Sequence, residues 1–136
     1  MDNLKTYLAP LGRLLMSSIF IWAGIGKLTA HDNYTGYFAS AHIPMPNVSV
    51  WIVGVFELVF GLAILVGFKT RWAAILLALF CLVTGFGVHL VSAMHSEGMA
   101  QVGQMVNFYK NLVMAGGFLY LVAYGAGGLS VDGEKA

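Results

Sequence analysis

The chain has 136 residues, of which 59% are hydrophobic and only 10% are charged, and its formal net charge is +1. These proportions exclude an ordinary soluble domain. The net charge is also weak and the Lys and Arg residues are dispersed along the chain, which excludes nucleic acid as a partner. The composition predicts a membrane protein whose surroundings are the lipid bilayer.

Four stretches are long and apolar enough to cross a bilayer as helices, which takes about 20 residues each. They run from 7 to 28, 48 to 68, 72 to 94 and 106 to 124. The first contains Arg13 and Lys27 and spans only if both side chains reach toward the membrane interfaces. We therefore expect an all-α fold, an integral membrane four-helix bundle that forms one domain over residues 1–136.

The basic residues predict the orientation of this bundle. Lys5, Lys69, Arg71 and Lys135 fall on one side of it, and basic residues near the ends of spans favour the cytoplasm. The opposite side receives the loops 29–47 and 96–105, which contain no Lys or Arg. Both termini are therefore predicted to be cytoplasmic.

The first outer loop carries residues that repeat at helical spacing, namely Tyr34, Tyr37, Phe38 and Ala41. This pattern predicts a short interfacial helix, which Pro44 and Pro46 would end before the second span. The helix would serve either as a lid over an outward-facing cavity or as an interfacial anchor.

The polar residues inside the spans fall on defined helix faces, because positions three, four and seven apart lie together. The faces are Arg13, Ser17, Phe20, Gly24 and Lys27 in the first span; Gly54, Glu57 and Gly61 in the second; Cys81, Gly85 and His89 in the third; and Asn107, Lys110, Met114 and Gly117 in the fourth. A charge that faces lipid costs several kcal/mol, so we expect Glu57 to point into the bundle.

The helical depths of these residues predict one polar cluster in the outer half, made of Lys27, Glu57, His89, Lys110 and Asn111. Lys27 and Lys110 would compensate the buried carboxylate. Arg13 lies in the other half, where interface phosphates or backbone carbonyls are its expected partners. The loop residues His31, His42, His95, Asp32 and Glu97 match no metal-ligand spacing, so no metal site is predicted.

Four motifs resemble the DoxX family, and together they cover nearly the whole chain. They are AGIGKL at 23–28, ELVFGLAILVGFKTR at 57–71, FYKN at 108–111 and GAGGLSVD at 125–132. The resemblance implies a four-helix protein of the bacterial inner membrane. Its recurrent positions would be Arg13, Lys27, Glu57, Lys110, Asn111, Ser130 and Asp132. The family takes its name from a membrane subunit of thiosulfate:quinone oxidoreductase, which implies a link to quinone redox chemistry.

Three functions remain open on the sequence. The first is an accessory subunit of a quinone-linked redox system, related to sulfur, thiosulfate or oxidative stress. In it Lys27, Lys110 and His89 would hydrogen-bond a quinone or small anion and Glu57 would accept a proton. With no flavin, haem or iron–sulfur motif, the chain has no intrinsic cofactor, and a redox partner subunit would supply the electron carrier.

The second function is a small proton-coupled transporter or channel, enlarged if the chain forms a homo-oligomer. The third is a structural scaffold in which the charges only fix helix register. No catalytic residue is identified for any of the three. Residues 125–132 are expected to form a flexible exit from the last helix, ending in Ser130 and Asp132.

Overall fold

The computed structural model describes residues 2–133, and the regular elements in this part of the chain are all helices, with no strand. The helices are α1 (Asp2–Thr29), α2 (His31–Ser40), α3 (Pro46–Val66), α4 (Thr70–Thr84), η1 (Gly85–Leu90), α5 (Val91–Met94) and α6 (Gly98–Tyr124). The segment η1 is a π-helix that joins α4 to α5 without a break. The predicted all-α class is confirmed; Lys135 lies outside the described residues.

Within residues 2–133, three helical stretches are long and apolar enough to cross a membrane: Leu4–Thr29 in α1, Pro46–Val66 in α3, and Thr70–Met94 in the α4–η1–α5 rod. Helix α6 is also long, with 27 residues, but its first turns are more polar. The prediction that 98–105 form a loop is wrong. This segment is helical and packs on α5, where Gln101 Nε2 donates to the carbonyl of Ala93 at 3.3 Å.

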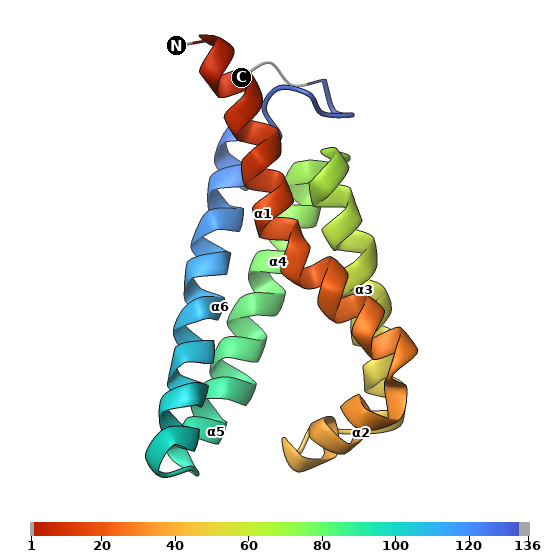
Figure 1. The fold of residues 1–136 in the computed structure, drawn as a ribbon, viewed down its shortest axis with the longest axis vertical. Helices are drawn as coiled ribbons and strands as arrows, with labels where there is room; N and C mark the ends of the chain where they lie inside the picture. Colours follow the sequence, from red (N-terminus) through yellow and green to blue (C-terminus); the bar gives the residue numbers. More distant parts are fainter. Residues whose placement is uncertain (1, 134–136) are drawn as a thin grey trace.

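The long helices form two packed pairs, α1 with α3 and α4 with α6, joined by the tight turn between α3 and α4. The pairs converge at the end of the molecule where both termini lie and diverge toward the opposite end, which carries α2 and α5 (Figure 1). The side chains in the space between the diverging pairs form the candidate site described below.

Glycines let α1 and α3 approach closely. A Cβ atom on Gly24 would lie 2.8 Å from the carbonyl oxygen of Gly54, and one on Gly61 would lie 3.1 Å from Ile21. The predicted inward stripe of α1 is confirmed, because Arg13, Ser17 and all its other members are buried. Small residues at such spacing are typical of helix interfaces in membranes.

The apolar core lies where the two pairs converge. Its rings meet closely, with the Phe20 and Phe118 centroids 5.4 Å apart. The other buried members are Ile64, Ala73, Ala74, Leu77, Ala78, Cys81 and Ala115. Large apolar side chains such as Ile52, Trp72 and Val113 remain exposed on the outside, as expected for a surface that contacts lipid.

The predicted short helix in the first outer loop is confirmed as α2, but the prolines do not end it. The helix stops at Ser40, and His42 follows in the left-handed region with φ 58°. Pro46 is instead the first residue of α3, where a fixed φ and the absence of an N–H suit a helix start.

Candidate functional site

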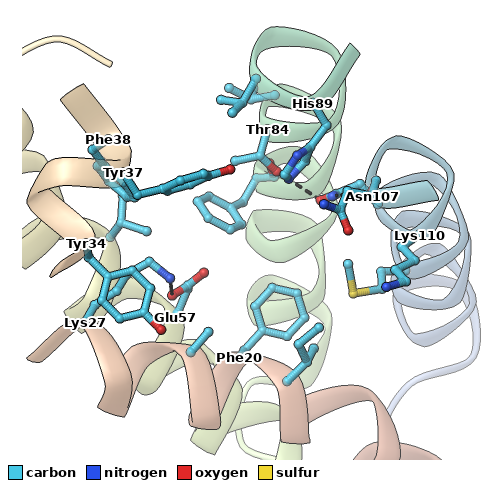
Figure 2. A pocket seen from close by; sticks show the side chains of 18 of the residues that line it. Phe20, Lys27, Tyr34, Tyr37, Phe38, Glu57, Thr84, His89, Asn107 and Lys110 are labelled. Carbon is cyan, nitrogen blue, oxygen red and sulfur yellow. Dashed lines mark hydrogen bonds and ion pairs between the residues drawn. The ribbon is translucent and has the colours of Figure 1, made fainter. Parts of the chain in front are cut away.

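A cavity of about 530 Å³ lies between the two helix pairs, on the side where they diverge. Aromatic and aliphatic side chains make most of its wall, and a few polar groups interrupt them (Figure 2). The polar residues are Lys27, Glu57, Thr84, His89, Asn107, Lys110 and Asn111, and α2 contributes Tyr34, Tyr37 and Phe38. All five residues of the predicted cluster therefore line this one cavity.

Lys27 and Glu57 form an ion pair on the wall made by α1 and α3. Lys27 Nζ lies 2.7 Å from Glu57 Oε2, and only 9% and 8% of the two side chains are exposed. Gly54 lies one turn before Glu57, and a Cβ there would lie 3.0 Å from Lys27 Cβ. The missing side chain at Gly54 thus lets the lysine reach the carboxylate, and the pair reduces the cost of burying either charge.

Helix α2 covers this ion pair with Tyr34. Lys27 Nζ lies 5.1 Å from the centroid of the Tyr34 ring, which is a cation–π geometry. The Tyr34 hydroxyl rests against α1, because a Cβ on Gly26 would lie only 2.7 Å from it. Gly26 therefore provides the space in which α2 closes over Lys27.

The facing wall carries the other three members of the cluster, on η1 and α6. Asn111 Nδ2 donates to the carbonyl of Asn107 at 2.9 Å, and Thr84 Oγ1 donates to Asn111 Oδ1 at 3.0 Å. His89 Nδ1 lies 2.9 Å from Gln104 Oε1. Lys110 is exposed and forms no ion pair within residues 2–133.

The expectation that Glu57 meets two lysines is therefore wrong in one respect. Lys27 bonds the carboxylate, whereas Lys110 lies across the cavity from it (Figure 2). The reason is the divergence of the helix pairs, which separates α6 from α3 at this depth. Spacing along each helix places both lysines on inward faces, but it carries no information on the distance between the faces.

The π-helix η1 was not predicted from the sequence. It spans GFGVHL, and its wider turns set the position of His89. Its first residue, Gly85, packs on α6, where a Cβ would lie 3.1 Å from Asn111 Cβ. Short π segments within α-helices often occur at functional sites. The paired glycines 85 and 87 are the only sequence signal for it, because they weaken the α-helical preference at this point.

The predicted secondary residues Arg13, Ser130 and Asp132 lie together at the opposite end, away from the cavity. Arg13 Nη2 donates to the carbonyls of Gly128 and Leu129, at 3.1 and 2.7 Å. Arg13 is 1% exposed, and its Nε and Nη1 have no hydrogen-bond partner in residues 2–133. Backbone carbonyls were one of its two expected kinds of partner.

The segment after α6 is not a flexible exit, so this prediction is wrong. It folds back on the α3–α4 turn, where the N–H groups of Val131 and Asp132 donate to the carbonyls of Val66 and Gly67. Ser130 packs against Gly67, at which a Cβ would overlap both Ser130 and Arg13. We call residues 125–133, together with Arg13, the C-terminal clasp.

Asp132 caps helix α4 from this clasp. Its carboxylate accepts hydrogen bonds from the Lys69 N–H at 2.7 Å, the Thr70 N–H at 2.8 Å and the Thr70 hydroxyl at 2.7 Å. Burial alone would raise the pKa of Asp132, but these hydrogen bonds and the charge of Arg13 outweigh it and hold the pKa below its ordinary value. The carboxylate also complements the positive end of the helix dipole.

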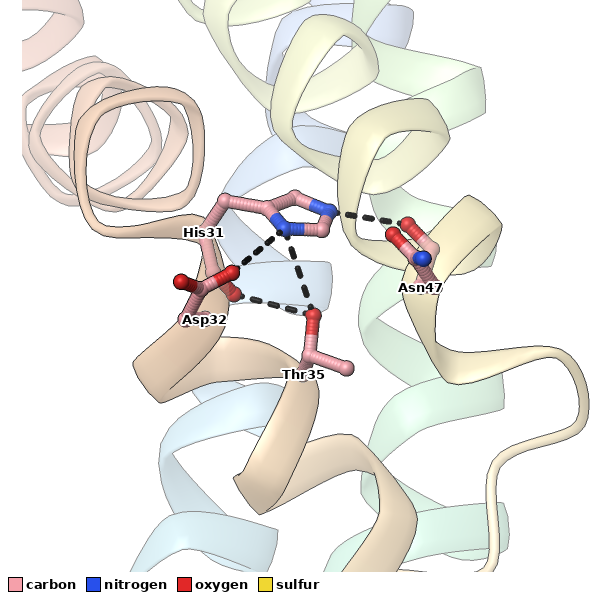
Figure 3. A network of polar contacts seen from close by, with 4 residues as sticks. All are labelled: His31, Asp32, Thr35 and Asn47. Carbon is pink, nitrogen blue, oxygen red and sulfur yellow. Dashed lines mark hydrogen bonds and ion pairs between the residues drawn. The ribbon is translucent and has the colours of Figure 1, made fainter.

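A separate polar network fastens the start of α2 to α3 (Figure 3). His31 Nε2 donates to the carbonyl of Asn47 at 2.9 Å, and its ring stacks on Trp51 at 4.7 Å between centroids. His31 Nδ1 lies 3.5 Å from Asp32 Oδ1 and from Thr35 Oγ1. Within residues 2–133, no group of three His, Cys, Asp or Glu side chains could hold a metal ion.

The helices and the buried ion pair define a multi-pass membrane protein. Residues 8–90 match the family model described as DoxX. The chain is 37% identical to the inner membrane protein YqjF of Escherichia coli K12, over 97% of this chain and 95% of the relative. It is 34% identical to the inner membrane protein YphA of the same organism, over 94% and 90%. This chain belongs to the DoxX family.

A third relative is the ER-derived vesicles protein ERV29 of Saccharomyces cerevisiae, which is 27% identical over 98% of this chain and 36% of its own length. No solved structure matches the chain. The family resemblance seen in the sequence motifs is confirmed, and so is the predicted location in a bacterial inner membrane.

Proposed function

We propose that this chain binds a membrane-soluble quinone in the cavity between its helix pairs, as an accessory subunit of a quinone-linked redox system. The observation that carries the proposal is the cavity itself, whose wall is largely apolar and aromatic with charged groups on two facing sides. Binding sites for small organic molecules are typically such pockets, with few polar groups that fix orientation.

The wall composition suits a quinone head group. Phe20, Phe38 and Phe80 offer flat apolar surface to a ring, and Lys27 and Lys110 offer N–H donors to carbonyl oxygens at opposite sides. The electron carrier would belong to a redox partner subunit, in a sulfur, thiosulfate or oxidative-stress system. The chain would then position the quinone, while the partner would exchange electrons with it.

The proposed topology is a four-span bundle with cytoplasmic termini. As an α-helix of 27 residues, α6 is about 40 Å long, and it packs along the rod formed by α4, η1 and α5. The rod Thr70–Met94 is long and apolar enough to span the membrane, so α6, which packs on it, would lie at the same depth. Lys5 and Lys69 then lie at the cytoplasmic end, as the distribution of basic residues favours.

Tryptophan fluorescence provides the test, because Trp22 lines the cavity. The protein is placed in nanodiscs with Trp51→Phe and Trp72→Phe, and decylubiquinone is titrated. We expect saturable quenching in excess of that caused by partitioning into empty nanodiscs. Ala23→Phe, which fills the cavity, should weaken binding at least tenfold, whereas Ala123→Phe on the exposed face of α6 should not. Unsaturable quenching that is the same in both variants would contradict the proposal.

One observation favours a second function, a proton-coupled transporter. The Lys27–Glu57 pair lines a cavity instead of lying in the sealed core, so solute and protons could reach it. Solute uptake by liposomes that contain only this chain, abolished by Glu57→Gln, would support transport. If neither uptake nor quinone binding is found in a folded protein, the structural scaffold becomes the better explanation.

A further inference from the structure

His89 presents a hydrogen-bond acceptor to the cavity. An amide oxygen only accepts, so the 2.9 Å contact with Gln104 Oε1 requires the proton on His89 Nδ1. In the neutral ring the other nitrogen, Nε2, then carries a lone pair. Nε2 has no hydrogen-bond partner within residues 2–133, and the side chain lines the cavity (Figure 2).

Glu57 presents a second acceptor on the facing wall. Only its Oε2 is bonded to Lys27, and Oε1 makes no hydrogen bond within the described part of the chain. Glu57 is 6% exposed. The cavity is the open space that Glu57 lines.

Each wall therefore carries one cation and one acceptor: Lys27 in contact with Glu57 on α1 and α3, and, without a contact between them, Lys110 and His89 on α6 and η1. A quinone carbonyl can accept from the cation but has nothing to donate to the acceptor. A phenolic hydroxyl does both, because it donates its proton and accepts through oxygen. The two walls are thus complementary to an aromatic ring with hydroxyl groups at opposite positions.

We infer that the cavity selects the reduced quinone, a para-diphenol, over the oxidised form, and that Gln104 is the positioning residue that fixes the His89 tautomer. This inference rests on the proposed function and names the redox form bound at that site. A bound quinone would displace water from Oε1 and Nε2 without offering either atom a donor, which costs binding free energy.

The first experiment compares decylubiquinol with decylubiquinone under anaerobic conditions, with the fluorescence titration described above. Each unmade hydrogen bond weakens binding about 3- to 10-fold, so two of them predict a preference for the quinol of about 10- to 100-fold. Equal binding, or a preference for the quinone, would overturn the inference and leave the proposed function intact. Failure of both to bind would remove the proposed function as well.

The second experiment tests the tautomer. Gln104→Leu removes the acceptor for Nδ1–H, so we expect the quinol preference to fall about 3- to 10-fold. Gln104→Glu keeps an acceptor and should retain the preference. The ¹⁵N shifts of labelled His89 report the tautomer directly and should change only in Gln104→Leu. The control is His95→Gln, because His95 is exposed and is bonded to the carbonyl of Val91.

The two readouts of Gln104→Leu decide whether Gln104 acts through His89. Loss of the preference together with an altered ¹⁵N pattern supports the inference. An unchanged preference in Gln104→Leu would overturn the role of Gln104. So would a lost preference with an unchanged tautomer, because Gln104 would then act by another route.

Discussion

At the scale of single residues, the buried carboxyl group at position 57 depends on one neighbour. Glu57 lies in the middle of α3, a helix with no other charged side chain. Its stability comes from the 2.7 Å contact with Lys27, because an isolated charge at this depth would cost several kcal/mol. Removing one partner of the ion pair should therefore cost more stability than replacing both partners with neutral residues.

Replacing Glu57 should destabilise the fold because it leaves Lys27 buried without a counter-charge. We expect Glu57→Gln to lower the free energy of unfolding by about 3–5 kcal/mol, and the double variant Lys27→Met, Glu57→Gln to recover most of it. Thermal unfolding in nanodiscs measures both, with Asp32→Asn at an exposed carboxylate as control. A raised unfolding midpoint in Glu57→Gln alone would show that the pair is not stabilising.

Asp132 should make the free energy of unfolding depend on pH in the acidic range. Its pKa is lowered in the folded state, so its contribution is fully present above the unfolded pKa of about 3.9 and is lost as pH falls through the lower folded value. Asp132→Asn should therefore lower the unfolding midpoint at pH 7. The difference from the natural protein should shrink as the pH falls below the unfolded pKa and vanish below the lowered folded pKa. A difference independent of pH would contradict this role.

At the scale of helices, the contact of α1 with α3 depends on glycine. Gly24→Ala would put a Cβ 2.8 Å from backbone atoms of Gly54 and Leu58, which cannot move aside as a side chain can. We expect a loss of about 1–3 kcal/mol in unfolding free energy. Gly12→Ala in the same helix meets nothing within 4 Å and should be neutral or stabilising. Equal effects of the two variants would argue against close packing at Gly24.

Periodicity predicted the inward faces of α1 and α3. In α6 the predicted face was wrong: the buried residues are Phe108, Asn111, Ala115 and Phe118, and none of Asn107, Lys110, Met114 and Gly117 is fully buried. Arg13, Lys27 and Glu57 are buried as expected, because a charge leaves the lipid face whatever the partner helix does. The same reasoning could not place Lys110 relative to Glu57, which depends on the angle between helix pairs. Nor could it find η1, since a π turn depends on the packing of Gly85 against Asn111.

The end of the chain shows a second limit of sequence reasoning. The run GAGGLSVD has the composition of a flexible segment, and nothing local fixes its path. Its order comes from partners that are distant in sequence, namely Arg13 and the N-terminus of α4. A fold-back of this kind is visible only once the helices have been placed.

At the scale of the whole molecule, labelling of single cysteines tests the proposed topology. In a Cys81→Ala background, Glu97→Cys lies between α5 and α6, and Lys69→Cys lies in the α3–α4 turn. On intact spheroplasts, a membrane-impermeant maleimide should label the first variant and not the second. Both should react once the membrane is permeabilised. The reverse pattern would contradict cytoplasmic termini, and labelling of both in intact spheroplasts would contradict the four-span arrangement.

The C-terminal clasp limits the passage of small molecules between the two helix pairs. Between the cavity and the clasp lies the aromatic core around Phe20 and Phe118, and beyond it Arg13 is fastened to the carbonyls of residues 128 and 129. The packed core and the clasp therefore close the space between the helix pairs at the end where the pairs converge. A molecule that enters the cavity would have to leave on the side from which it came. Passage to the end of the molecule where the clasp lies would require Arg13 to release the carbonyls of Gly128 and Leu129.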